Sequence, residues 1–202
     1  MARTPLSMLI LSYRLSQRGH HPHWFGYSAT LESLQQITHR WVEFIHDNVG
    51  QGAYVCIGHS LGTVIIRHAL PRLQTHQPSA CFFLAPPMVA CQVARFFSRV
   101  WLYQMINGEM GQLLAQPDFM ARLPVPPNTT IYAGTGGPRA SWFPLGNQPN
   151  DGILSVAEAT GNFGLNVIEV PAMHTLIMNS NVVFADIANA LACMPQRSDG
   201  TK

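Results

Sequence analysis

The feature that most constrains this chain is a sharp turn at Gly58-His59-Ser60-Leu61-Gly62. An apolar run at 53–57 leads into the turn, and a helix-forming run at 63–70 follows it. A strand that turns abruptly into a helix strains its central residue and raises that side chain at the strand's carboxyl end. We predict that Ser60 occupies this position, where the free N–H groups of a helix N-terminus favour negative charge. Gly58 and Gly62 are expected because a side chain at either would collide with the neighbouring helix and strand.

Strand-like and helix-like segments alternate along the rest of the chain. Further strands are predicted at 23–27, 80–85, 129–134 and 165–170. Three helices are predicted. The first runs from Thr4-Pro5 to Gly19, with Leu6, Leu9, Ile10 and Tyr13 facing inward. The second is capped by Thr30 and runs to residue 49, and the third covers 181–194. This alternation predicts an α/β fold with a mainly parallel sheet flanked by helices. With 202 residues the chain forms a single domain, 1–202, with a flexible polar tail at 196–202.

Residues 88–127 interrupt this alternation between two predicted strands. One face of the first half is apolar, and Arg95 and Arg99 lie opposite. An amphipathic helix inserted above the carboxyl end of a sheet is what a lid over an apolar substrate pocket requires. A helix that only covers the core satisfies the same pattern, so both interpretations stay open.

The amino-acid composition indicates which kinds of molecule the protein binds. Charged residues make up 11% of the chain, against about 25% in an average soluble domain, and the net charge is +2. No basic stripe with interleaved aromatic residues occurs, so we expect no nucleic acid partner. The low charge instead favours an apolar surface and peripheral contact with lipid.

The cysteines do not indicate disulfide bonds, and the apolar runs do not indicate a membrane-spanning helix. The four cysteines form no C-x-x-C pair, and Cys56 and Cys81 fall in predicted core strands, so we expect reduced thiols. No apolar run approaches the ~20 residues of a membrane helix, and no signal peptide is visible at Met1. A cytoplasmic location is the default expectation.

A serine hydroxyl becomes a good nucleophile only when a histidine takes its proton and an acid orients that histidine. The only histidine beyond residue 76 is His174, directly after the strand at 165–170. Asp151 follows the strand at 129–134, in the turn Asn150-Asp151-Gly152. We therefore predict Ser60, His174 and Asp151 as the catalytic residues. The less suitable acids lie in the insertion, in a strand or on a short helix: Glu109, Asp118, Glu169 and Glu158. A plain turn-forming Asp151 or a solvated His174 are the alternatives.

The other histidines are weaker candidates. His59 adjoins Ser60, but consecutive residues at such a turn point in different directions, so we expect His59 to pack beneath the turn. His20, His21 and His23 resemble a metal-binding cluster, yet no acid or cysteine nearby completes a ligand set. We expect no metal and no cofactor.

Three motifs together resemble the α/β-hydrolase superfamily, and within it the lipase and GPI inositol-deacylase-like branch. They are the turn at 58–62, the segment Asn150-Asp151-Gly152-Ile153-Leu154-Ser155, and Met173-His174-Thr175. The resemblance covers nearly the whole chain. It implies hydrolysis of esters through an acyl-enzyme, in which Ser60 attacks, His174 carries the proton and Asp151 orients His174.

The chain departs from this pattern at its beginning. Such enzymes have an earlier strand ending in His-Gly, and the N–H of a following residue forms half of the oxyanion hole. Here Met1-Ala2-Arg3-Thr4-Pro5 resembles the residues just after that strand, so Met1 would stand at the oxyanion position beside the N–H of Leu61. We expect that the chain is truncated and lacks its first strand or strands. The loss of one such donor costs ~3–4 kcal/mol of transition-state stabilisation.

The leading hypothesis is a serine hydrolase acting on a small-molecule or lipid ester. An acyltransferase would use the same triad, and a catalytically impaired binding protein would keep the fold without the chemistry. A perhydrolase has no sequence feature in its favour. The sequence does not distinguish the acyl or alcohol group of the substrate, or the oligomeric state.

Overall fold

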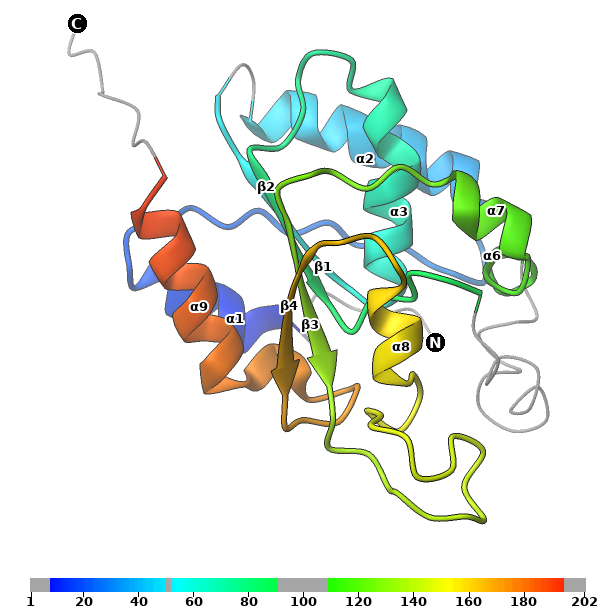
Figure 1. The fold of residues 1–202 in the computed structure, drawn as a ribbon. Helices are drawn as coiled ribbons and strands as arrows, with labels where there is room; N and C mark the ends of the chain where they lie inside the picture. Colours follow the sequence, from blue (N-terminus) through cyan, green and yellow to red (C-terminus); the bar gives the residue numbers. More distant parts are fainter. Residues whose placement is uncertain (1–7, 50–51, 91–108, 195–202) are drawn as a thin grey trace, which may run out of the picture.

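The computed structural model of the protein describes residues 8–49, 52–90 and 109–194. Its centre is a sheet of four parallel strands, in the order β1-β2-β3-β4 (Figure 1). The strands are β1 (Val55–His59), β2 (Ala80–Leu84), β3 (Thr129–Gly134) and β4 (Asn166–Val170). Each corresponds closely to a predicted strand, and the predicted α/β arrangement of a parallel sheet flanked by helices is confirmed.

The helices form a layer on each side of the sheet. Each strand pairs with the next one along the chain, so the chain steps across the sheet in one direction. Connections between parallel strands are right-handed. A chain that steps across the sheet in one direction therefore places all its connecting helices on the same face of the sheet. These are α3 (Leu61–Ala69), α6 (Glu109–Leu114), α7 (Pro117–Arg122) and α8 (Val156–Thr160), with α2 (Leu34–Val49) packed against α3. The other face carries α1 (Leu9–Ser16) and α9 (Asn181–Ala192) (Figure 1).

Strand β2 divides its side chains between the two layers. All five of its residues are buried. Cys81 and Phe83 join the apolar cluster of α2 and α3, whereas Phe82 and Leu84 join the cluster of α1 and α9. This alternation is what a strand covered on both faces requires. Cys56 of β1 is the register partner of Cys81; both are free thiols, and the pKa of Cys56 is raised by its contact with Cys81 and by burial.

The first helix presents a different face from the one predicted. Leu11 and Leu15 are buried between the sheet and α9, while Ile10 and Tyr13 are more than half exposed. The helix also ends at Ser16, short of Gly19. Apolar residues occupy more than one side of this segment, so their spacing alone does not determine which side packs. The Arg14 guanidinium, 3.8 Å from the centre of the Phe184 ring, helps to hold the observed orientation.

Residues 23–27, predicted as a strand, are irregular except for a single bridging residue, Tyr27. The Arg40 guanidinium donates a hydrogen bond to the Gly26 carbonyl at 2.6 Å and lies 5.2 Å from the centre of the Phe25 ring. The carbonyl that a strand ladder would use is therefore bound by a side chain of α2. The prediction of a strand here was wrong.

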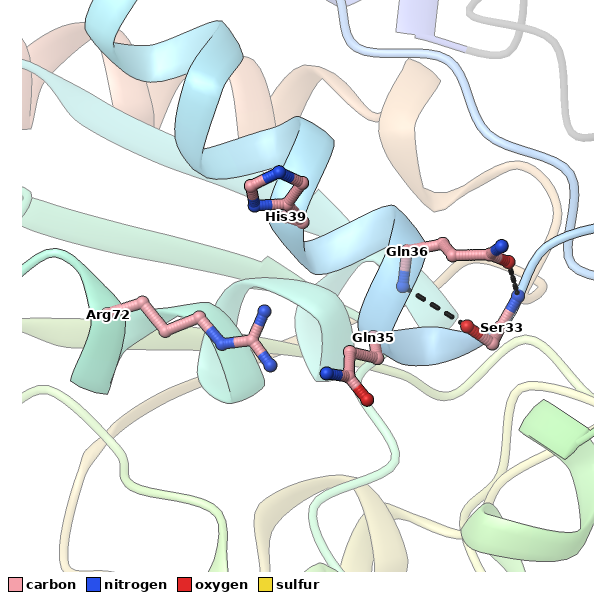
Figure 2. Close-up of a pocket in the computed structure, with 5 residues that line it drawn as sticks. All are labelled: Ser33, Gln35, Gln36, His39 and Arg72. Atoms are coloured by element: carbon pink, nitrogen blue, oxygen red, sulfur yellow. Dashed lines mark hydrogen bonds between the residues drawn. The ribbon is translucent and has the colours of Figure 1, made fainter.

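Helix α2 is capped by Ser33 and not by the predicted Thr30. The Ser33 hydroxyl accepts from the Gln36 N–H, and the Gln36 amide oxygen accepts from the Ser33 N–H. This reciprocal pair satisfies two backbone donors at once. Leu31, predicted to face the core, is consequently 86% exposed. A surface pocket of about 570 Å³ lies beside the cap (Figure 2) and is lined by Ser33, Gln35, Gln36, His39 and Arg72.

The described part of the predicted insertion packs into the core. Met110, Met120 and Leu123, from α6, α7 and the residue that follows α7, are almost completely buried in the cluster of α2 and α3. The predicted apolar face at Val93, Phe96, Phe97, Val100, Trp101 and Met105 lies outside the described residues. The lid-like role of 88–127 therefore stays a prediction. No helix in the described ranges is long and apolar enough to cross a bilayer.

A buried arginine connects α3 to both ends of the 88–127 segment. The Arg67 guanidinium donates to the carbonyls of Met88, Met120, Leu123 and Pro124. No carboxylate of the described residues forms an ion pair with it. Loss of solvent lowers the pKa of Arg67 to about 10, so the side chain stays charged at neutral pH. Charge-assisted bonds to carbonyls therefore take the place of a counter-ion.

Substitution of Arg67 tests this connection. We expect Arg67→Met to lower the free energy of unfolding by ~3–5 kcal/mol, because several buried carbonyls lose their donor. The control is Arg72→Met, the same change at an exposed arginine nearby, with an expected effect within ~0.5 kcal/mol. Urea denaturation of both variants measures the difference. Equal stabilities would show that the guanidinium bonds contribute little.

Candidate active site

The turn between β1 and α3 has the strained geometry that the sequence predicts. Ser60 has φ 51° and ψ −121°. Its N–H donates to the Leu84 carbonyl of β2 at 2.9 Å, which extends the sheet by one bond. Its carbonyl accepts from the N–H of Thr63 at 3.0 Å and from the Thr63 hydroxyl at 2.7 Å. The sheet and the helix thus hold Ser60 from both sides, and the hydroxyl lies at the carboxyl end of β1.

The two glycines of the turn differ in what they permit. A Cβ at Gly58 would lie 2.8 Å from Ile66 Cδ1 and 3.1 Å from the backbone nitrogen of Thr63. A Cβ at Gly62 would meet only the Tyr27 hydroxyl, at 3.9 Å, among the described atoms. The predicted collision is therefore present at Gly58. At Gly62 the described atoms show no such collision, so the predicted one is not found within the part of the chain that the structure describes.

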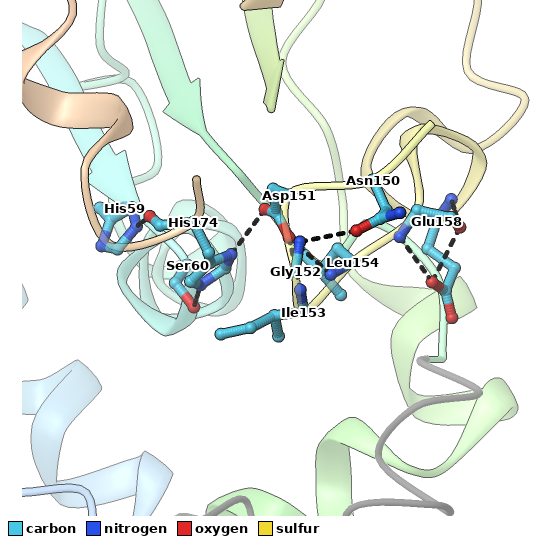
Figure 3. A network of polar contacts seen from close by, with 10 residues as sticks. His59, Ser60, Asn150, Asp151, Gly152, Ile153, Leu154, Glu158 and His174 are labelled. Atoms are coloured by element: carbon cyan, nitrogen blue, oxygen red, sulfur yellow. Dashed lines mark hydrogen bonds and ion pairs between the residues drawn. The ribbon is translucent and has the colours of Figure 1, made fainter. Parts of the chain in front are cut away.

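The structure brings Ser60, His174 and Asp151 together in one hydrogen-bonded chain (Figure 3). His174 Nδ1 lies 2.7 Å from Asp151 Oδ2, and His174 Nε2 lies 2.9 Å from Ser60 Oγ. A carboxylate only accepts, so Nδ1 carries the proton and Nε2 accepts from the serine hydroxyl. The residues are 5%, 2% and 1% exposed, respectively. This arrangement can remove a proton from Ser60 without any movement of the backbone.

Asp151 is held in place by the turn that contains it. Its Oδ1 accepts from the N–H groups of Ile153 and Leu154 at 2.8 and 2.7 Å, which leaves Oδ2 for His174. The neighbouring Asn150 is fully buried, accepts from the N–H of Gly152, and donates to the carbonyls of Pro138 and Gln148. The buried carboxylate is therefore fully hydrogen-bonded and aimed at the imidazole.

The other acids serve elsewhere or face solvent. Glu158 caps α8 through a reciprocal pair with Ser155. Asp118 on α7 and Glu169 on β4 are exposed, and the side chain of Glu109 lies outside the described residues. Among the described acids, Asp151 is the one that contacts His174.

Gly134, the last residue of β3, and Gly136 and Gly137 beyond it allow two segments to approach each other. These are the turn that contains Asp151 (the acid turn) and the loop after β4 that carries His174 (the histidine loop). A Cβ at Gly134 would lie 2.7 Å from both the Ala172 carbonyl oxygen and Asp151 Cβ. A Cβ at Gly136 would lie 2.7 Å from the Ala172 carbonyl carbon, and one at Gly137 would collide with Asn150 and Gly152. These positions are not among the residues predicted from the sequence. The available signal was the run Gly134-Thr135-Gly136-Gly137, which begins at the last residue of a predicted strand.

His59 is buried as predicted, and it also makes a contact that the sequence does not reveal. Its Nε2 lies 2.8 Å from the backbone carbonyl oxygen of His174. The two imidazole rings are 5.0 Å apart, centre to centre. The residue before Ser60 therefore touches the histidine that binds the Ser60 hydroxyl.

The predicted oxyanion site is described in part. Leu61 is the first residue of α3, and an N–H at that position has no acceptor within the helix. Met1, the other predicted donor, lies outside the described residues. Strand β1 has β2 as its partner within the described sheet and lies at its edge. Nowhere in the described ranges do three His, Cys, Asp or Glu side chains gather in a way that would hold a metal.

Comparisons with known proteins bear on the fold. No family model and no curated protein matches the sequence. Bacillus licheniformis lipase BlEst2 in propeptide form aligns with a TM-score of 0.61 at 17% identity, over 85% of this chain and 43% of the lipase. The chain therefore spans less than half of that protein. The mature form of the same lipase aligns with a TM-score of 0.56 at 17% identity, over 79% of this chain and 75% of the lipase.

The NocB thioesterase domain, in a covalent complex with a fluorophosphonate nocardicin G analog, gives a TM-score of 0.50 at 15% identity, over 94% and 88% of the chains. At such identities a likeness shows the fold alone. The chain has the α/β-hydrolase fold.

The two glycines of the turn give a stability test. Gly58→Ala is expected to lower the free energy of unfolding by ~1–3 kcal/mol, because the backbone of Thr63 cannot move away from the new Cβ. Gly62→Ala is expected to be neutral or to stabilise by ~0.5–1 kcal/mol, since alanine favours the helix. Thermal and urea unfolding of the two variants measures the difference. The same effect from both substitutions would contradict the difference in space at the two positions.

Proposed function

We propose that this protein is a serine hydrolase that cleaves lipophilic carboxylic esters through an acyl-enzyme. The observation that supports it most is the hydrogen-bonded chain from Asp151 through His174 to Ser60, built on a serine with positive φ. A buried serine at a sheet edge has no structural need for a histidine whose far nitrogen is fixed by a carboxylate. Nucleophilic catalysis needs this arrangement.

The proposed reaction uses these residues in two steps. Ser60 Oγ bonds to the carbonyl carbon of the ester while its proton passes to His174 Nε2. The carbonyl oxygen becomes an oxyanion beside the N–H of Leu61, and Asp151 stabilises the imidazolium. As the C–O bond to the alcohol breaks, His174 gives the proton to the leaving oxygen. Water then attacks the acyl-enzyme and loses a proton to His174. As the bond between Ser60 Oγ and the acyl carbon breaks, His174 returns this proton to Ser60 Oγ and the acid is released.

The preference for lipophilic esters has separate support. Met173 and Leu176, on either side of His174, are 47% and 53% exposed. Large apolar side chains that are exposed within two residues of His174 favour an apolar substrate. Assignment to the GPI inositol-deacylase-like branch is the finest part of the proposal and rests on the motifs at 150–155 and 173–175. Acyl transfer to an alcohol would use the same residues.

A fluorophosphonate probe tests the nucleophile without knowledge of the substrate. We expect one probe per chain, attached to Ser60, with no labelling of Ser60→Ala. Asp151→Asn should slow labelling by ~10³–10⁴-fold, because asparagine favours the wrong tautomer of His174. The rate of labelling, with the site mapped by mass spectrometry, is the measurement.

Asp118→Asn is the matched control, since it makes the same change at an exposed acid and should label at the wild-type rate. A folded wild type that takes no label would overturn the proposed chemistry and favour a binding protein. Labelling of Asp118→Asn as slow as that of Asp151→Asn would refute the assigned acid.

The acyl group is tested with p-nitrophenyl esters of increasing chain length. We expect kcat/KM to rise from acetate to octanoate by about fourfold for each methylene that becomes buried. The same acyl groups presented as thioesters provide a comparison of the leaving group. A rate that falls beyond acetate would exclude the lipophilic preference while leaving the triad intact.

A further inference from the structure

The loop that carries His174 is anchored at both ends by buried apolar residues, Val170 and Ile177, but the residues on either side of His174 are exposed. It connects β4 to η3 (Ile177–Asn179), and Met173 and Leu176 are about half exposed. Next to His174 itself, hydrogen bonds therefore help to fix the position of the imidazole relative to Ser60. The His174 backbone and the His174 ring both make such bonds.

Each hydrogen bond of the His174 ring is accompanied by a bond of its backbone. The ring donates to the Asp151 carboxylate, and the His174 N–H donates to the Asp151 carbonyl at 2.9 Å. The ring also accepts from Ser60, and the His174 carbonyl accepts from His59 at 2.8 Å. One pair of bonds connects the loop to the acid turn. The other pair connects it to two consecutive residues, His59 and Ser60.

His59 is well placed for this second connection. It is the last residue of β1, its side chain is buried, and it is the register partner of Leu84 in the centre of the sheet. A backbone carbonyl can only accept, so His59 Nε2 carries the proton of this bond. The ring packs against that of His174 at an interplanar angle of 51°. A rigid strand thus holds the histidine loop at a point one residue from the nucleophile.

We propose that His59 is a positioning residue, which sets the distance between His174 Nε2 and Ser60 Oγ by binding the His174 carbonyl. This inference rests on the proposed function of the triad. Loss of the bond would leave a buried carbonyl without this donor and free the loop to shift outward. A displacement of about 1 Å at a reacting group slows catalysis by ~10²-fold.

Two substitutions of nearly equal size separate the bond from the packing. His59→Gln keeps an N–H donor near the position of Nε2, and His59→Met has none. We expect His59→Met to lower the rate of fluorophosphonate labelling of Ser60 by ~10²-fold, and His59→Gln to recover most of that loss. The control is His68→Met, which removes the contact of a half-buried histidine of α3 with Thr38 and should label at the wild-type rate.

A second readout does not depend on activity. The proton between His174 Nδ1 and Asp151 gives a low-field NMR resonance, expected in the wild type and in His59→Gln and broadened or absent in His59→Met. A normal rate and resonance in His59→Met would overturn the proposal. Equal defects in both variants would overturn it as well, because packing alone would then be responsible. If the wild type takes no label, the proposed function fails, and the resonance alone decides the role of His59.

Discussion

The positive φ of Ser60 is the constraint on which the rest of the site depends. A non-glycine residue in such a region costs ~1–3 kcal/mol and persists only where its surroundings leave no alternative. Here Leu84 binds the N–H of Ser60, Thr63 binds its carbonyl twice, and α3 cannot swing away because Arg67 bonds it to two loops. Core packing and the buried guanidinium thus maintain the strain that presents the hydroxyl.

The order of the strands places Ser60 and His174 after strands that are not neighbours, and the loops bring the two residues together. Ser60 follows β1, whereas Asp151 and His174 follow β3 and β4, so β2 and β3 separate the strand before Ser60 from the strand before His174. The acid turn and the histidine loop must therefore fold back across the carboxyl edge of the sheet. Glycines at the end of β3 and just beyond it allow this, because any side chain at Gly134 or Gly136 would collide with the backbone at Ala172. The backbones of the acid turn and the histidine loop can thus lie close together at the carboxyl edge of the sheet.

The features that were predicted correctly from the sequence are those that depend on a local pattern of residues. Buried strands of apolar residues, and a serine between a strand and a helix, follow from short stretches such as 53–62. What failed depends on distant partners: the buried face of α1 is chosen by α9, and the strand expected at 23–27 is lost to a side chain of α2. The cap at Ser33 is different, because its Ser-x-x-Gln spacing is visible in the sequence just beyond the predicted cap at Thr30. The bonds of Arg67 and His59 join residues more than 20 positions apart, and no local pattern reveals them.

The backbone bonds of His174 also explain how the site could keep its shape while a proton moves. During the proposed reaction the imidazole becomes charged and the serine hydroxyl is consumed, so both bonds of the ring change strength. The His174 N–H and carbonyl, which bind Asp151 and His59, do not change charge when the proton moves, so the proton transfer does not weaken these bonds directly. Even a doubly protonated His59 would still donate from Nε2. The loop can therefore stay fixed while its side chain exchanges partners, which is the preorganisation that general base catalysis requires.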